Sequence, residues 1–219
     1  MIDGAESFIR HALSIGAFEF RPESYLLNSG RISPYFFNSA RFDTGESLYV
    51  LSSPYAQIAK SQRAEVVYGP IYKGASLAVA VSVVAHTKHG LKIGWAYNRK
   101  VPKDHAEGGL IVGASLSGHR VLIVDDVMST GKSSDEAVDT IRLEGGIVVG
   151  FAIAFDREER KSEDGELSAL QEFQAKYLIP VFSIATLTDL ISVLQADQSP
   201  RALDILPKLR AYQEQYGAK

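Results

Sequence analysis

The sequence predicts an α/β fold: a central, mainly parallel sheet flanked by helices. From about Val66, short β-branched runs alternate with helical stretches, the pattern of a parallel sheet covered on both faces. The runs at 121–124 and 147–156 are almost continuously apolar, as strands buried on both sides are. A chain of 219 residues with 46% hydrophobic and 22% charged residues fits one globular domain, which we assign to residues 1–219.

The individual elements follow from hydrophobic periodicity and from the residues that begin and end helices. Helices are expected near residues 3–16 and after Glu46, and the segment between them, 29–45, is turn-rich and aromatic. Beyond this N-terminal part we expect strands at 66–69, 93–98, 119–127, 147–156 and 181–184, and helices at 75–90, 133–146, 186–195 and 199–216. Two polar segments interrupt the pattern. Residues 99–109 have too few apolar side chains to anchor in a core, and residues 157–165 are expected to be a solvated excursion.

Composition excludes several classes of protein. The net charge of −3 gives no reason to expect a nucleic-acid partner or binding to an anionic membrane surface. No stretch approaches the roughly 18 uninterrupted apolar residues of a membrane span, and residues 1–16 do not resemble a signal peptide. The absence of cysteine excludes disulfides and thiolate catalysis, and we expect a cytoplasmic protein.

The strongest local signal is VLIVDDVMSTGKSS at 121–134. Four apolar residues predict a buried strand, Asp125 and Asp126 stand at its carboxyl end, and a turn of small residues opens a helix. Backbone N–H groups at a helix N-terminus bind phosphate, and two adjacent carboxylates suit vicinal sugar hydroxyls. The phosphate-binding candidates are Val127, Met128, Ser129, Thr130, Gly131, Lys132 and Ser133.

This segment is compatible with two other interpretations. Residues 131–133, Gly-Lys-Ser, match the end of a Walker A loop, but the first glycine of that motif would fall on Asp126, so a P-loop hydrolase is not expected. The small residues would also serve as ordinary helix caps after a strand. The adjacent carboxylates favour the ligand site, because capping alone gives no reason for them.

A buried strand, Asp-Asp and a Thr/Gly turn resemble the PRPP-binding signature of type I phosphoribosyltransferases. Further segments narrow the resemblance to the orotate phosphoribosyltransferase family: SGRISPYFFN at 29–38, YGPIYKG at 68–74, NRKVPKDHAEGG at 98–109 and FDRE at 155–158. The resemblance implies a small N-terminal hood, a flexible catalytic loop and transfer of ribose 5-phosphate from PRPP to orotate. The products would be pyrophosphate and orotidine 5'-monophosphate, in pyrimidine (UMP) biosynthesis.

The resemblance also implies roles for particular residues. Phe36 and Phe37 would bracket orotate, Arg157 would pair with its carboxylate, and Asp125 and Asp126 would hold the ribose hydroxyls. Without the flanking SGR and SPY residues, an ordinary core would be the favoured interpretation of the phenylalanine pair.

The remaining implied roles concern the leaving group. Lys73 and Tyr72 would lie in the loop that meets the pyrophosphate. The catalytic loop would supply Arg99, Lys100, Lys103 and His105. On the residues alone, a solvated basic loop is an equal alternative for 99–109. A lysine before glycine is usually just exposed, so the role of Lys73 rests mainly on the resemblance.

The family resemblance extends to a cofactor and a partner. It implies Mg²⁺ bound mainly through PRPP or pyrophosphate oxygens, with no dedicated protein ligands, and a homodimer with shared active sites. Asn28 stands where the family usually has a substrate-binding lysine, and Lys132 where it usually has threonine. Two alternatives therefore stay open: a relative that uses another acceptor base, and a PRPP-binding regulator without turnover.

Overall fold

The computed structural model describes residues 4–27, 29–103, 109–128, 131–162, 164–197 and 199–218. Its largest element is a six-stranded sheet in the order β5-β4-β3-β6-β7-β8, in which only the β4–β5 pair is antiparallel. The strands are β3 (Val66–Tyr68), β4 (Gly94–Lys103), β5 (Gly109–Gly113), β6 (Arg120–Asp125), β7 (Ile147–Asp156) and β8 (Val181–Thr186). The expectation of a mainly parallel sheet is confirmed.

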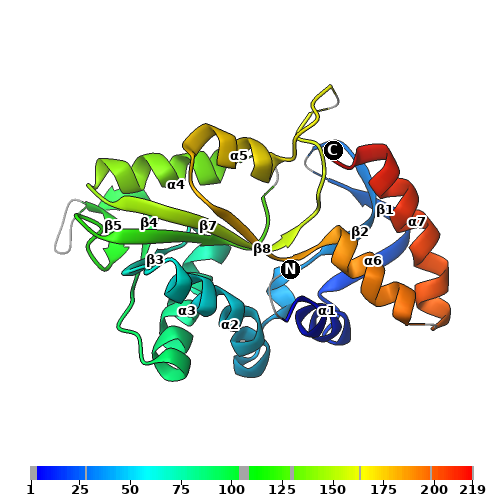
Figure 1. Ribbon diagram of the computed structural model, residues 1–219, viewed down its shortest axis with the longest axis horizontal. Coiled ribbons are helices and arrows are strands. Elements are labelled where there is room, and N and C mark those ends of the chain that lie inside the picture. Colours follow the sequence, from blue (N-terminus) through cyan, green and yellow to red (C-terminus); the bar gives the residue numbers. More distant parts are fainter. Residues whose placement is uncertain are drawn as a thin grey trace.

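Helices cover both faces of this sheet, as Figure 1 shows. One face carries α2 (Gly45–Ser61) and α3 (Lys73–His89), and the other carries α4 (Lys132–Leu143) and α5 (Ala169–Tyr177). Along β6, Leu122 and Val124 belong to the core on the α2 and α3 side, whereas Val121 and Ile123 belong to the core on the α4 and α5 side. All four are fully buried, which explains why this strand reads as an unbroken apolar run.

A smaller unit, the hood, lies beyond the carboxyl end of β7 (Figure 1). It contains the antiparallel pair β1 (Phe18–Leu26) and β2 (Ile32–Phe37), followed by the short helix η1 (Ser39–Arg41). Three helices surround the pair: α1 (Ala5–Ser14), α6 (Leu187–Ala196) and α7 (Pro200–Tyr216). The rings of Phe18 and Phe37 lie 5.0 and 5.5 Å from that of Phe155 on β7, so aromatic packing joins the hood to the main sheet.

The structure corrects the expectation of turns at 29–45, because residues 32–37 form a strand. Its side chains at Ser33, Tyr35 and Phe37 are buried. Pro34 is tolerated because a two-stranded sheet consists only of edge strands, so no ladder hydrogen bond is lost on its outer side.

Both polar segments also differ from expectation. Residues 99–103 continue β4, and Lys103 pairs with Gly109 of β5, because backbone ladder bonds do not require apolar side chains. Residues 104–108 lie outside the described part of the chain. The segment 157–165 is not a solvated excursion throughout, since the side chains of Arg157 and Glu159 are only 13% and 12% exposed.

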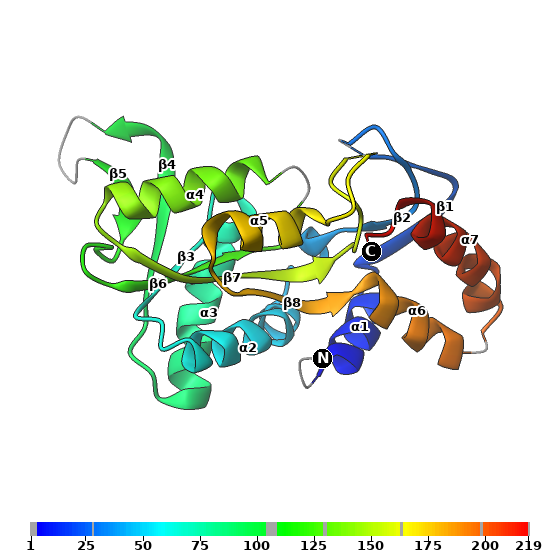
Figure 2. The ribbon, with the colours of Figure 1, turned by 45° about the horizontal axis from the view of Figure 1, so that its top comes forward.

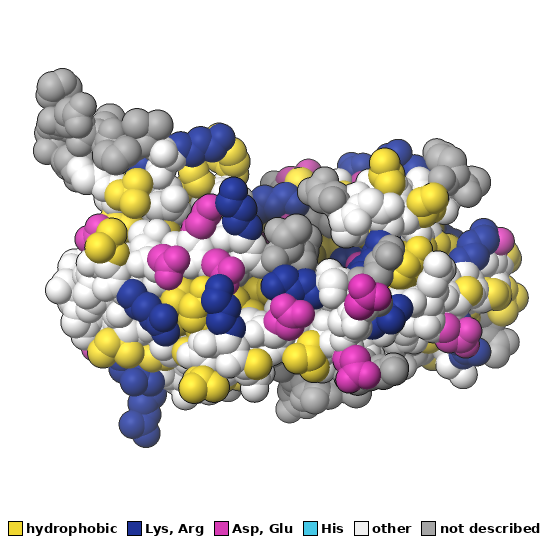
Figure 3. All heavy atoms as spheres, turned by 90° about the horizontal axis from the view of Figure 1, so that it is seen from above, with side chains coloured by type: hydrophobic (Ala, Val, Ile, Leu, Met, Phe, Trp, Pro, Cys, Tyr) yellow, Lys and Arg dark blue, Asp and Glu magenta, His cyan; other side chains and the backbone are white. Residues whose placement is uncertain are grey.

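The face formed by α4 and α5 is seen in Figure 3, where Lys and Arg side chains are interspersed with Asp and Glu. This mixture fits the small net charge of −3. Among the helices of the described ranges, none combines the length and the apolar character needed to cross a membrane.

The loop between β3 and α3 depends on two glycines whose backbones touch. A Cβ atom on Gly69 would lie 1.8 Å from the carbonyl oxygen of Gly74, and one on Gly74 would lie 2.9 Å from that of Val124. The first turn of α3 therefore sits against the end of β6 at a distance that side chains at these positions forbid. This contact brings Lys73 to the carboxyl end of β6.

Gly69→Ala should destabilise the protein by about 3 kcal/mol, the upper part of the range for overpacking, because the new methyl group meets backbone that cannot move aside. Urea unfolding measures the loss. Gly45→Ala, at the start of α2, is the matched control, since nothing lies within 4 Å of its Cβ position. That variant should stay within about 1 kcal/mol of the parent protein. Equal stability of the two variants would contradict the close approach.

Candidate active site

The site begins at the carboxyl ends of β3 and β6, where ligands gather in open α/β sheets. Lys73 Nζ, at the start of α3, lies 2.7 Å from Asp126 Oδ2, just beyond β6. The Ser39 hydroxyl of η1 donates to the same oxygen at 2.5 Å. The side chain of Asp126 is 10% exposed and that of Lys73 is 50% exposed, so the acid is embedded while the cation borders solvent.

Asp125, the last residue of β6, carries a carboxyl group with a raised pKa. Burial and, second, the neighbouring negative charge of Asp126 raise that pKa to about 7. The Asp126 N–H donates to Asp125 Oδ1 at 2.9 Å, and the Tyr55 hydroxyl donates to the Asp125 carbonyl at 2.7 Å. Carboxyl oxygens held in fixed positions at this strand end suit adjacent sugar hydroxyls, which both donate and accept hydrogen bonds.

The predicted phosphate turn is described only in part. Val127 and Met128 line a cavity, and Gly131 caps α4 with a φ of +81°, a left-handed conformation that favours glycine. Ser129 and Thr130 lie outside the described residues. Ser133 is exposed on the first turn of α4, whose N–H groups offer an anion site. Lys132 is 83% exposed and lies 3.9 Å from Glu136 on the same helix.

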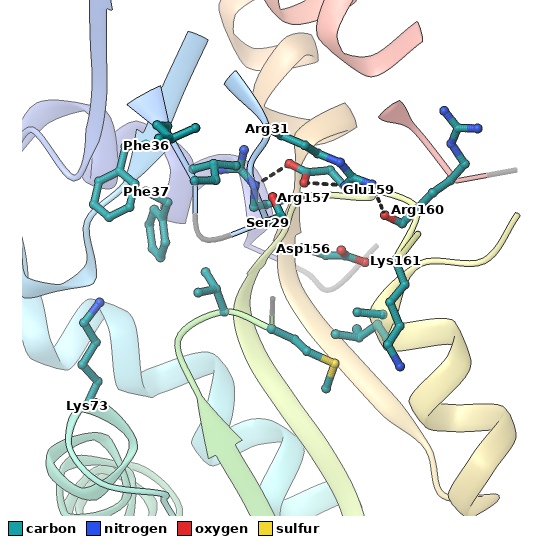
Figure 4. A pocket seen from close by; sticks show the side chains of 16 residues that line it. Ser29, Arg31, Phe36, Phe37, Lys73, Asp156, Arg157, Glu159, Arg160 and Lys161 are labelled. Carbon is teal, nitrogen blue, oxygen red and sulfur yellow. Dashed lines mark hydrogen bonds and ion pairs between the residues drawn. The ribbon is translucent and has the colours of Figure 1, made fainter. Parts of the chain in front are cut away.

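A cavity of about 290 Å³ opens between the hood and the end of β7 (Figure 4). Lys73 rises from α3 on one side, and Arg31, Arg157 and Glu159 lie together on the other. A second cavity of about 330 Å³ lies between η1, α2 and α3, and Asp126 and Tyr72 help to line it. Lys73 lines both cavities and therefore lies where the two cavities meet.

Phe36 and Phe37 both line the first cavity but have different surroundings. Successive side chains on a strand point to opposite faces. Phe37 is buried and stacks on Phe155, with a centroid distance of 5.5 Å. Phe36 is half-buried and stacks on Tyr25 at 5.6 Å.

A buried ionic network forms the opposite wall, and Glu159 is at its centre. Arg157 Nε donates to Glu159 Oε1 at 2.5 Å, and Arg31 Nη1 donates to Glu159 Oε2 at 3.0 Å. The Tyr212 hydroxyl of α7 donates to Oε1 at 2.8 Å. Nη2 of Arg157 donates to the Ser33 hydroxyl at 2.9 Å and to Tyr212 at 3.2 Å.

Aromatic rings hold the same arginines. The Arg157 guanidinium lies 4.3 Å from the ring centre of Tyr35 and 5.7 Å from that of Tyr212. Arg31 lies 5.1 Å from the ring centre of Tyr216. Burial lowers the pKa of Arg157, but the Tyr35 hydroxyl and the Glu159 carboxylate outweigh burial and hold it above its ordinary value, so this residue stays cationic.

Sequence reasoning assigned no role to Arg31, Glu159 or Tyr212. Arg31 stands inside the SGRISPYFFN segment, and Glu159 follows directly after FDRE. The alternation of charges in Asp-Arg-Glu-Glu-Arg at 156–160 was the available signal for a paired network. Nothing in the sequence pointed to Tyr212, whose place in α7 suits an ordinary buried aromatic residue.

The cations predicted for the catalytic loop are only partly visible. Lys100 Nζ lies 4.5 Å from the ring centre of Tyr72, which brings Lys100 close to the second cavity. Arg99 donates from Nη1 to the carbonyl of Gly109 at 3.2 Å, across the β4–β5 ribbon. Asn28, His105 and the side chain of Lys103 lie outside the described part of the structure.

Comparison with known proteins assigns first the class and then the family. Residues 55–174 match the phosphoribosyl transferase domain family. The chain is 46% identical to the orotate phosphoribosyltransferase of Nitrosococcus oceani, over 97% of this chain and 94% of that protein. It is 42% identical to that of Neisseria meningitidis serogroup C over the full length of both.

A solved structure agrees with the sequence comparisons. The orotate phosphoribosyltransferase of Francisella tularensis, 30% identical, has a TM-score of 0.81 over 97% of this chain and 100% of that one. The chain belongs to the orotate phosphoribosyltransferase family. The resemblance inferred from its motifs is thereby confirmed.

Replacement of Asp125 by asparagine should stabilise the protein above neutral pH. The folded protein binds the Asp125 proton more tightly than the unfolded chain, so this group lowers stability as the pH rises from its ordinary pKa of 3.8 through about 7. Asp125→Asn removes that cost. The gain should be at most about 4 kcal/mol at about pH 8 and should shrink as the pH is lowered, which urea unfolding at several pH values measures.

Asp135→Asn on α4 provides the control of opposite sign. Partial burial raises the pKa of Asp135, but hydrogen bonds from Lys176 and Tyr177 outweigh burial and hold it below its ordinary value. Its carboxylate therefore stabilises the fold above the ordinary pKa, and asparagine there should lower stability near pH 8. A loss of stability in both variants would show that the Asp125 carboxylate is well accommodated.

Proposed function

We propose that the protein transfers the ribose 5-phosphate of PRPP to orotate, producing orotidine 5'-monophosphate and pyrophosphate in UMP biosynthesis. One observation carries the proposal. Asp126, one of two adjacent carboxyl groups suited to a ribose, lines one of the two cavities that meet at Lys73, and the buried Arg157 guanidinium, suited to a carboxylate, lines the other. They occur in a chain whose relatives over nearly its full length are named for this activity.

The proposed reaction breaks the bond between the anomeric carbon and the diphosphate oxygen and forms one to a ring nitrogen of orotate. The diphosphate leaves with the bonding electrons, and the orotate nitrogen gives up its proton. The expected transition state resembles an oxocarbenium ion, so positioning and charge neutralisation account for the chemistry without a covalent nucleophile.

Each residue then has a defined task. Asp125 and Asp126 hold the ribose hydroxyls, and the 127–133 turn with the N-terminus of α4 holds the 5-phosphate. Phe36 and Phe37 bracket the orotate ring, with Arg157 at its carboxylate. The cations Lys73, Arg99, Lys100 and Lys103 neutralise the departing diphosphate, which His105 protonates or hydrogen-bonds.

The proposed cofactor is Mg²⁺, carried mainly by oxygens of PRPP or pyrophosphate. The donor chemistry at the strand end fits a hard cation, because the nearest side chains offer carboxylate oxygens. Burial and, second, the neighbouring charge of Asp126 raise the pKa of Asp125, and a nearby cation would relieve the charge repulsion. Bound there, the ion would supply positive charge to the leaving group.

We further propose a single-domain, cytoplasmic protein that pairs as a homodimer with shared active sites. A single-domain organisation is supported by a core cluster that runs from Phe8 in the hood to Leu122 in the main sheet. A second copy is supported by apolar side chains exposed along one side of α3, namely Tyr72, Val79 and Val83.

The purified protein should consume orotate only when PRPP and a divalent metal are both present, and it should release pyrophosphate in equal amount. The decrease in orotate absorbance and a coupled pyrophosphate assay measure the two sides of the reaction. Replacing orotate with adenine or uracil provides the acceptor control. PRPP binding without orotate consumption at high protein concentration would favour the regulator instead.

Mixing two inactive variants tests the shared sites. Lys103→Ala removes a loop cation, and Asp125→Asn combined with Asp126→Asn removes the ribose-binding pair. If each site takes its loop from the partner, re-equilibrated mixtures should recover up to roughly a quarter of parental activity, because about half the dimers are mixed and half of their sites are intact. Recovery of nothing from re-equilibrated dimers, or a fully active monomer in light scattering, would contradict sharing.

A further inference from the structure

Glu159 presents a puzzle in a pocket proposed to bind an anion. Its carboxylate is only 12% exposed, and it lines the cavity whose far wall carries Phe36 and Phe37. A negative charge at this position should repel the orotate carboxylate. Its place in the structure therefore requires a benefit that exceeds this repulsion.

The benefit lies in the three groups that Glu159 holds at once. Oε1 accepts from Arg157 Nε and from the Tyr212 hydroxyl, and Oε2 accepts from Arg31 Nη1. These donors come from three parts of the chain: the segment after β7, helix α7, and the turn before β2. Figure 2 shows that the segment after β7 runs beside the β1–β2 hairpin. One carboxylate thus joins three separate segments around the cavity.

The bonds also fix which end of Arg157 remains available. Nε donates to Glu159, and the two hydrogens of Nη2 are directed to Ser33 and Tyr212. Among the described residues, no partner is placed on Nη1, so this nitrogen is the end that can receive a ligand carboxylate. Within the network itself, two guanidinium groups against one carboxylate leave a net charge of +1, which leaves Arg157 free to attract a further carboxylate.

We propose that Glu159 is a positioning residue for the acceptor: it fixes Arg157 and Arg31, with Tyr212, so that Nη1 of Arg157 meets the orotate carboxylate. The inference rests on the proposed function and assigns to Glu159 and α7 a part in acceptor recognition. The gain from orienting a buried guanidinium exceeds the repulsion between two carboxylates, because Glu159 is already neutralised by its two arginines.

The direction of the change in the orotate KM distinguishes this positioning role from a purely electrostatic one. If Glu159 contributed only its charge, Glu159→Gln would make the wall more positive and would lower the KM for orotate. If Glu159 positions Arg157, the same substitution releases the guanidinium and raises that KM. PRPP binds at the β6 end of the site, so its KM should change little in either case.

The experiment measures initial rates of Glu159→Gln with orotate and PRPP varied in turn. The expected result is an orotate KM raised at least about tenfold, the loss typical of a buried charged hydrogen bond, with a PRPP KM within about twofold of the parent. Tyr212→Phe keeps the ring and removes the hydroxyl that bridges Glu159 and Arg157, and it should raise the orotate KM about threefold or more. Glu158→Gln is the matched control, because that carboxylate bonds to Thr188 of α6 instead and should leave both KM values unchanged.

The outcomes distinguish the two levels of the proposal. A parent protein that does not consume orotate overturns the proposed function itself. With an active parent, an orotate KM that is unchanged or lower in Glu159→Gln overturns the positioning role, as does a parallel rise in both KM values. Should Glu159→Gln fail to fold, because two arginines lose their buried counter-charge, Tyr212→Phe decides alone, and an unchanged orotate KM in that variant overturns the inference.

Discussion

The site depends above all on keeping two adjacent carboxyl groups at the end of a buried strand. Burial and mutual repulsion oppose the ionised pair, and the raised pKa of Asp125 records that cost. The surrounding structure offsets it with the ammonium of Lys73, the hydroxyl of Ser39 and backbone N–H groups. Lys73 reaches its position only because the backbones of Gly69 and Gly74 touch, so the chemistry at the strand end rests on a contact that admits no side chain.

The side of the cavity that carries Arg31 and Arg157 has the opposite charge, and different groups hold its charged side chains in place. There the buried groups are guanidiniums, and a glutamate, the Tyr212 hydroxyl and aromatic faces hold them. Every group that stabilises Arg157 comes from the hood, from α7 or from the segment after β7. Under the proposed role of Arg157, the hood and the C-terminal helix serve recognition as well as packing.

The main sheet and most of its helices were predictable, because strands buried on both faces, such as residues 121–124, show in the sequence as apolar runs. The hood strands were not, since residues 32–37 contain proline and serine and their burial depends on helices far along the chain. The site at the strand end with Asp125 and Asp126 was predictable because its signal is local. An apolar run, two adjacent carboxylates and a turn of small residues all stand within one short segment. The Arg31–Glu159 pair spans 128 positions, and single charges carry no sign of so distant a partner.

Separation of the two charge systems is itself a physical requirement. A carboxylate pair and an arginine cluster in direct contact would neutralise each other, and neither would remain available to a ligand. Phe37, Val127 and Met128 line the cavity between them, and Lys73 on the acidic side is already paired with Asp126. Two substrates would complement this separation of charge: a sugar on which positive charge develops, on the acidic side, and a base with an anionic group, on the arginine side. Under the proposed function, the arrangement orients both reactants by charge before any contact specific to either ring is made.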